Sequence, residues 1–395
     1  MESIIVACAQ QRMTIQPSHE EFEAEARRFL RQAVAKAARI VIFPELTGVM
    51  VAPPLISSLK LGLVRREDEA KRPNAGLLSR TVGRLAGGTA GTLGGGFRGS
   101  LERLVRKRND ALLDAYYHTF GGLAREFGMI MVGGSLYTFD DTSGTIRNRA
   151  YVFDADGEVL GYQDKLNLAP DETDLASPGE EINVLDTRYG RMGLLIGRDV
   201  LFPELARAIA LRGADLAVCI AASPGVAQAA MVRSALGVRA EENQFYVAAS
   251  FMLGPNMLGR GTREEFYGKS ALLAPISLTP GGTGVLVEAG TDRTEALIAA
   301  ELDGAALETL RSESRFRPRD EMHLGKARAD LAEFYGSSMS VAEAVEQRLA
   351  HRPPEPRPVW SRVETPVIEP EPDAGEAKEL AAAGGQESGS PDLEG

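Results

Sequence analysis

The stretch GRMGLLIGRDVLFPELARAIALRGADLAV, residues 190–218, runs from an apolar strand through an amphipathic helix into a second apolar strand. Met192–Ile196 predicts a buried strand, Pro203–Arg212 predicts a helix, and Leu216–Ile220 predicts the next strand. Between the first strand and the helix the chain passes tightly through Gly197–Asp199. A strand, a helix and a strand in this order indicate an α/β fold.

The same alternation extends over most of the chain in both directions. Further strands are predicted at Ile4–Ala9, Ile40–Phe43, Met129–Gly133, Ala150–Phe153, Phe245–Ser250 and Ser270–Ala274, and further helices at Glu20–Ala38, Asp110–Phe127 and Ala229–Asn243. Between two short β runs, Asp156-Gly157 predicts a hairpin turn, because this pair readily adopts the positive φ that such a turn needs. Strands and helices with hairpins among them predict α/β layers around a partly antiparallel sheet.

Composition excludes several classes of protein. The 395 residues include 44 Lys and Arg against 55 Asp and Glu, a formal net charge of −11, so we expect no nucleic-acid partner. Cys8 and Cys219 lie far apart in apolar runs, which excludes a disulfide scaffold and a cysteine-based zinc site, and with 4 histidines we expect no metal or cofactor. The sequence has no uncharged apolar run of about 18 residues and no signal-peptide pattern, so we expect a cytoplasmic protein.

Charged residues follow three predicted strands. In IVIFPEL, residues 40–46, Glu45 comes just past the end of a buried strand, where open α/β sheets present ligand-binding groups. In GYQDKLNLAPDET, residues 161–173, Lys165 follows a strand and Glu172 comes seven residues later. Taken alone, a glutamate near a lysine is most simply explained as a structural ion pair.

Together with residues 190–218, these segments resemble the nitrilase superfamily of carbon–nitrogen hydrolases, and the resemblance runs from about Ser3 to about Leu307. In that family a glutamate in a Pro-Glu turn is the general base, a lysine stabilises the oxyanion, a second glutamate holds the lysine, and a cysteine at a strand end is the nucleophile. The resemblance implies these first three roles for Glu45, Lys165 and Glu172. Further matches are Gln10, Asp156-Gly157, Phe202-Pro203-Glu204, Glu242-Asn243, Tyr246-Val247 and Gly268-Lys269-Ser270.

The resemblance also implies a four-layer αββα sandwich over residues 1–307, assembled as a homodimer or larger homo-oligomer. We expect a small-molecule ligand, an amide, nitrile or carboxylate, with Arg198, Asp199 and Ser223 contacting it. If the Arg198 guanidinium reached Glu45, the site would be neutralised and suited to an anionic ligand.

The chain departs from the family at the nucleophile, because Gly197 stands at the cysteine position. Glycine cannot form a thioester, and neither native cysteine is placed to replace the nucleophile, because both lie within predicted strands. We therefore expect a non-catalytic or strongly impaired amidase homologue that binds a small ligand. The alternative is an active hydrolase of linear amides or nitriles that uses water activated by Glu45.

One further segment lies within this domain and two follow it in the sequence. Residues 55–108 hold twelve basic and four acidic side chains on short amphipathic helical patterns. We expect this basic insertion to cover the pocket or to form oligomer contacts; it could also bind an acidic tail, or dock on an anionic membrane, which would make the chain a peripheral scaffold. Residues 308–351 predict a helical extension with oligomer contacts, and residues 352–395 a disordered acidic tail.

Overall fold

The structure, a computed structural model, describes residues 1–56, 96–259 and 264–319 and, farther along, 323–325, 327–336 and positions 343, 346 and 350. Contacts divide the chain into one unit of Met1–Met322 and another of His323–Gly395. In the second unit the structure describes helix α8 (Ala327–Tyr335). Residues 57–95 of the predicted basic insertion and the predicted tail, 352–395, lie outside the described residues.

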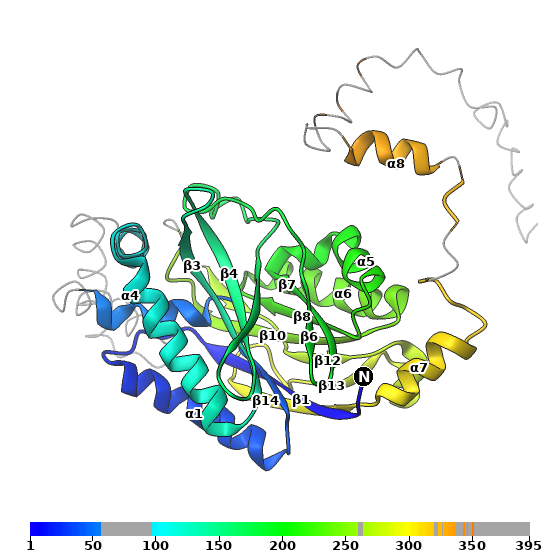
Figure 1. The fold of residues 1–395 in the computed structure, drawn as a ribbon, viewed down its shortest axis with the longest axis horizontal. Helices are drawn as coiled ribbons and strands as arrows, with labels where there is room; N and C mark the ends of the chain where they lie inside the picture. The colour runs from blue at the N-terminus through cyan, green and yellow to red at the C-terminus, as the bar shows by residue number, and fades with distance from the viewer. Residues whose placement is uncertain are drawn as a thin grey trace, which may run out of the picture. The chain divides into compact units, whose positions relative to one another are not determined.

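The first unit is built on one continuous sheet of mixed direction (Figure 1). Its main path runs β5 (Val159–Asp164), β4 (Thr145–Phe153), β3 (Ile130–Asp140), β2 (Ile40–Ile42), β1 (Ile4–Arg12), β10 (Tyr246–Pro255), β8 (Leu216–Ala221), β7 (Gly190–Ile196), β6 (Val184–Thr187). The strands from β3 to β7 along this path are parallel, and the pairs at its two ends are antiparallel. The partly antiparallel sheet predicted from the hairpin is therefore confirmed.

Five further strands complete the sheet. They are β9 (Ser223–Pro224), β11 (Glu265–Tyr267), β12 (Ala271–Leu273), β13 (Val285–Glu288) and β14 (Ala296–Leu302). Of these, β14 pairs antiparallel with β1, while β11 and β12 both pair antiparallel with β10.

Alternation of side chains along the strands produces the layers. Ile40 and Ile42 of β2 and Leu194 of β7 belong to one buried cluster between the two halves of the sheet. Val41 points the other way, toward α1 (His19–Ala35) and α4 (Gly96–Phe127), because successive side chains of a strand lie on opposite faces.

On the other half of the sheet, Leu195 packs in a third cluster with α5 (Pro203–Leu211) and α6 (Val226–Asn243). Figure 1 shows α1 and α4 on the outer side of one half of the sheet, and α5 and α6 on the outer side of the other half. The predicted four-layer αββα arrangement is confirmed. The first unit continues beyond the predicted domain end at residue 307, which falls inside α7 (Gly304–Glu313).

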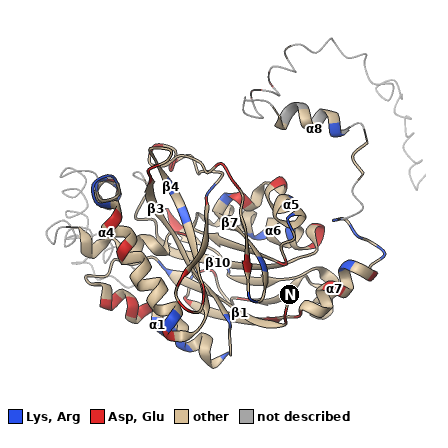
Figure 2. Ribbon diagram, in the orientation of Figure 1, with Lys and Arg blue, Asp and Glu red and all other residues tan. Residues whose placement is uncertain are grey.

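Helix α4 begins well before the predicted helix at Asp110. Its backbone is interrupted at Arg108 (φ −146°, ψ 42°). The part of the helix before this interruption lies within residues 55–108, the predicted basic insertion. Figure 2 shows Lys and Arg along this part. Its apolar side chains are buried in the core of the first unit: Phe97, Leu101, Leu104 and Val105. This face is therefore already covered by protein, and among the described residues it offers no apolar surface to a membrane. No described helix is long and apolar enough to cross a bilayer.

We predict that Leu101→Ala lowers the free energy of unfolding by about 2–4 kcal/mol, because it leaves a cavity at a fully buried position. The exposed Arg106→Ala on the same helix should change it by less than about 0.5 kcal/mol. Urea denaturation of the full chain measures both. Equal, small effects would show that the first part of α4 does not belong to the core.

Candidate active site

Three strands bring the predicted site residues to one end of the sheet. Glu45 follows β2, Lys165 directly follows β5, and Gly197 directly follows β7. These three strands run in the same direction through the register of the sheet, so their carboxyl ends face the same side. The structure therefore brings together residues that are about 30 to 150 positions apart in the sequence.

The Lys165 ammonium lies between two carboxylates. Its Nζ is 2.7 Å from Glu45 Oε1 and 2.6 Å from Glu172 Oε2. The three side chains are 4%, 2% and 10% exposed, respectively. At this burial, water contributes little to solvating the charges, so each ion depends on its partners.

Neutral hydrogen-bond donors also bind the carboxylates of this triad of Lys165, Glu45 and Glu172. The sequence alone did not identify these donors. Asn148 Nδ2 donates to Oε1 of both carboxylates at 3.1 Å, and Tyr137 OH donates to Glu172 Oε1 at 2.8 Å. The backbone N–H of Ala222 donates to Glu45 Oε2 at 2.8 Å. Each carboxylate is thus held by at least two groups besides Lys165, because the Ala169 N–H also donates to Glu172.

Burial and charge act differently on the two carboxylates. Burial raises the pKa of Glu45 above its ordinary value, and the nearby charge of Glu172 adds to this effect against the opposing charge of Lys165. Burial would also raise the pKa of Glu172, but Lys165 and the hydrogen bonds to this carboxylate lower it overall. Burial alone would lower the pKa of Lys165, and the two carboxylates raise it instead, so the lysine stays protonated. Of the two carboxylates, Glu45 takes up a proton more readily.

Gly197 adopts a left-handed backbone conformation, with φ +55°. A Cβ at this position would lie 2.8 Å from Glu45 Oε2 and 3.1 Å from Lys165 Nζ. The backbone angle favours glycine over other residues. Because 2.8 Å is shorter than a normal contact, a side chain at position 197 requires the end of the Glu45 side chain to shift slightly. Its first atom would then lie beside both the Glu45 carboxylate and the Lys165 ammonium.

Asp199 is buried and binds backbone rather than facing open space. Its Oδ1 accepts from Asn167 N at 2.7 Å, and its Oδ2 accepts from Ile196 N at 3.1 Å and Leu166 N at 3.3 Å. Burial raises the pKa of Asp199, against the effect of its hydrogen bonds. These contacts tie the 3₁₀ turn Gly197–Leu201 to the chain just after Lys165, which favours a positioning role. That Asp199 contacts a ligand stays a prediction.

A pocket of about 470 Å³, its open mouth included, lies over the triad. Both Arg198 and Ser223 line it, and that they contact a ligand stays a prediction. The Arg198 guanidinium donates to the Leu168 carbonyl at 3.0 Å and does not neutralise Glu45, whose charge is met by Lys165. Other lining residues include Arg98, Tyr137, Asp171, Asn256 and Phe266. Among the described residues, no three His, Cys, Asp or Glu side chains are arranged as metal ligands.

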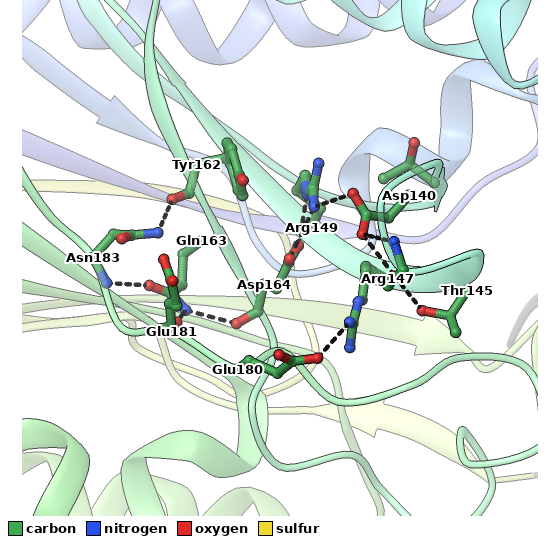
Figure 3. A network of polar contacts seen from close by, with 12 residues as sticks. Asp140, Thr145, Arg147, Arg149, Tyr162, Gln163, Asp164, Glu180, Glu181 and Asn183 are labelled. Carbon is green, nitrogen blue, oxygen red and sulfur yellow. Dashed lines mark hydrogen bonds and ion pairs between the residues drawn. The ribbon is translucent and has the colours of Figure 1, made fainter.

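Polar contacts on β4 and β5 fix the backbone at Lys165 (Figure 3). Arg149 makes two hydrogen bonds to Asp164, of 2.7 and 2.9 Å, and its guanidinium lies 4.0 Å from the centre of the Tyr162 ring. Arg147 donates to the Pro178 carbonyl and is 3.1 Å from Glu180 Oε1.

The backbone of Lys165 itself is paired on both sides. Its N–H donates to the Asn148 carbonyl at 2.8 Å, and its carbonyl accepts from Gly179 N at 2.8 Å. The strand that carries Asn148 therefore orients Lys165 through the main chain as well as through the amide side chain.

We predict that Lys165→Met lowers the free energy of unfolding by about 3–5 kcal/mol at pH 8, because two buried carboxylates lose their cation. Without the lysine, the folded-state pKa values of Glu45 and Glu172 rise above their unfolded values. The penalty is then present at high pH and relieved as the pH falls and the carboxylates take up protons. Urea denaturation at pH 5 and pH 8 measures it, with Lys269→Met, a lysine 40% exposed, as the control. An equal loss at both pH values would contradict the buried-charge explanation.

Comparison with known proteins agrees with this fold. A family model described as carbon-nitrogen hydrolase matches residues 5–312. Omega-amidase NIT3 of Saccharomyces cerevisiae is 32% identical over 198 residues, which cover 48% of this chain and 64% of the relative. Omega-amidase NIT2 of Bos taurus is 31% identical over 203 residues (48% and 67%), and N-carbamoylputrescine amidase of Solanum tuberosum is 31% identical over 196 residues (46% and 62%). The chain thus spans about two thirds or less of these curated relatives.

Solved structures share the fold. Saccharomyces cerevisiae Nit3, a member of branch 10 of the nitrilase superfamily, matches with a TM-score of 0.55 at 22% identity. The match covers 81% of this chain and 97% of the Nit3 chain. The NitN amidase of Nesterenkonia sp. AN1 has a TM-score of 0.56 at 21% identity, with 83% and 98% covered. A mutant of that amidase carries acrylamide at its active site cysteine. Because the family model spans most of the first unit, this chain belongs to the carbon–nitrogen hydrolase family, the nitrilase superfamily.

Proposed function

We propose that this chain is a carbon–nitrogen hydrolase homologue that binds a small amide, nitrile or carboxylate and hydrolyses it very slowly or not at all. The observation that carries the proposal is the position of Gly197. A Cβ at position 197 would lie beside both Glu45 and Lys165. A nucleophilic side chain at this position would therefore meet a base and an oxyanion-stabilising cation. In this chain that point carries no nucleophile.

The remaining groups are suited to binding. In the proposed roles, Glu45 is the general base, Lys165 polarises a carbonyl oxygen and Glu172 holds Lys165. These interactions do not depend on a nucleophile, because the carboxylates are bound by Lys165, Asn148 and the Ala222 N–H, none of which belongs to position 197. Removing the nucleophile of a cooperative site nevertheless costs about as much activity as removing the whole catalytic unit.

Hydrolysis by activated water is the second candidate. The raised pKa of Glu45 makes it a stronger base than an ordinary glutamate, and the pocket exposes both Glu45 and Lys165 to a ligand. Water attacking the carbonyl carbon would give its proton to Glu45 while Lys165 stabilises the oxyanion. The same experiment separates the two candidates.

We predict no measurable ammonia release by the wild-type protein from a panel of amides, nitriles and N-carbamoyl compounds. Gly197→Cys should release ammonia from at least one of them, because a thiol at this position lies beside Glu45 and Lys165. Coupled glutamate dehydrogenase assays measure the release.

The matched control is Gly197→Ala, which adds the same Cβ and the same backbone strain, about 1–3 kcal/mol, without a thiol. It should stay inactive. Wild-type turnover that disappears in Glu45→Ala would contradict the proposal and establish the water mechanism.

We also propose that the chain assembles as a homodimer or larger homo-oligomer. The support is the outer face of α6, where the exposed side chains are small or apolar: Val226, Ala227, Ala230, Met231, Ser234 and Val238. A continuous uncharged face on an exposed helix is typical of an interaction surface. Membrane docking through residues 55–108 has less support, because the apolar face of its described part is buried.

We predict that Met231→Glu shifts the wild-type oligomer toward the monomer in sedimentation velocity, because it places a charge in the centre of this face. Val34→Glu, at a residue 51% exposed against 58% for Met231, is the matched control on α1 and should leave the assembly unchanged. A monomeric wild-type protein, or the same distribution for both variants, would exclude α6 as the interface.

A further inference from the structure

Arg98, in the first turn of α4, joins three segments around the mouth of the pocket. Its Nη2 donates to the Asp171 carbonyl at 2.7 Å and lies 2.6 Å from Asp174 Oδ1. Its Nη1 donates to the Leu258 carbonyl at 2.8 Å. The Arg98 side chain is only 13% exposed and that of Asp174 is 35% exposed, so the two contacts to carbonyl oxygens are partly buried and the ion pair lies nearer the surface.

Two of these contacts flank Glu172 in the sequence. Asp171 and Asp174 belong to the short loop that carries Glu172 to Lys165, and this loop is closed locally by the Glu172 carbonyl, which accepts from Leu175 N and Ala176 N at 2.9 Å. The contacts of Arg98 with Asp171 and Asp174 therefore also hold the backbone from which the Glu172 carboxylate reaches Lys165.

The part of α4 that carries Arg98 is anchored independently of the rest of the helix. The helix is interrupted at Arg108, and before that point Phe97 and Leu101 are buried in the core. The backbone that carries Arg98 is therefore held in place by the packing of Phe97 and Leu101.

We propose that Arg98 is a positioning residue of the site, which holds the loop of Asp171–Asp174 against the start of α4 and so keeps Glu172 at Lys165. The inference rests on the proposed function, because it concerns the same triad. It assigns a role in the site to a residue from the basic insertion.

The chemistry of the contacts requires arginine. Two carbonyl oxygens and one carboxylate are bound by two nitrogens of one planar guanidinium, which directs its donors along fixed lines. A lysine carries one nitrogen and cannot reach the same three oxygens in this geometry. Arg98→Lys should therefore preserve the charge but hold the loop of Asp171–Asp174 less firmly.

Amide hydrogen exchange of the full-length protein tests the positioning role without any ligand. In Arg98→Met we expect faster exchange, about tenfold or more, in residues 168–176 as well as in residues 96–107, and an intermediate effect in Arg98→Lys. Arg106→Met, an exposed arginine on the same helix, is the matched control and should resemble wild type. Faster exchange confined to residues 96–107 would overturn the proposal, because Arg98 would then stabilise only its own helix.

A thiol introduced by Gly197→Cys provides the second readout. Cys8 and Cys219 are fully buried and their pKa values are raised, so iodoacetamide should modify the introduced thiol first. Loss of Glu172 from Lys165 leaves the ammonium less neutralised beside the thiol, which stabilises the thiolate. Adding Arg98→Met should therefore move the pH profile of alkylation down by about 0.5 unit or more, and adding Arg106→Met should not move it.

The two readouts separate the inference from the proposed function. An introduced thiol that iodoacetamide never reaches would contradict the proposed pocket, while hydrogen exchange would still decide the role of Arg98. A reactive thiol whose pH profile is the same with and without Arg98 would contradict the positioning role and leave the proposed function intact.

Discussion

The pairing of one buried ammonium with two buried carboxylates is the constraint on which the site depends. Transferring each of these ions out of water costs several kcal/mol, so Lys165, Glu45 and Glu172 are tolerated only as a unit with their hydrogen-bond partners. Much of the surrounding structure maintains that unit. Asn148 bridges the two carboxylates, the β4–β5 contacts fix the backbone of Lys165, and the loop that carries Glu172 is tied to the start of α4.

The same constraint is compatible with the proposed function, in which the site binds a ligand without a nucleophile at position 197. The charges of Lys165, Glu45 and Glu172 are satisfied by one another and by groups from β3, β4, the loop after β5 and the chain after β8, and position 197 supplies none of these contacts. A glycine with positive φ is compatible with the turn there and removes the strain that a side chain would add. Under the proposed function, the charges around position 197 therefore do not depend on a nucleophile, and a ligand can bind without being hydrolysed.

Sequence alone predicts the parts of this protein that follow from periodicity and charge. Alternating apolar runs identify the long strands and the core helices. Glu45 and Lys165 stand out as charged residues just after strands, and the resemblance of three motifs, in order, to a family implies their roles. Asn148 and Tyr137 were missed, because neutral side chains inside strands give no such signal and the predicted strand began only at Ala150. At the start of α4 the sequence predicts a basic amphipathic segment, and it does not reveal that the apolar face of this segment is covered by the protein's own core. The role of Asp199 depends on backbone N–H groups brought near by folding.

The central claim is that the wild-type pocket binds an amide and leaves it intact. Saturation-transfer difference NMR of the full-length protein with small amides and their carboxylate analogues tests it most directly, because one sample reports both contact and conversion. The account predicts transfer to at least one unconverted ligand, lost in Lys165→Met, with no product signal over the experiment. Accumulating product in the wild-type sample, or transfer that is unchanged in Lys165→Met, would contradict it.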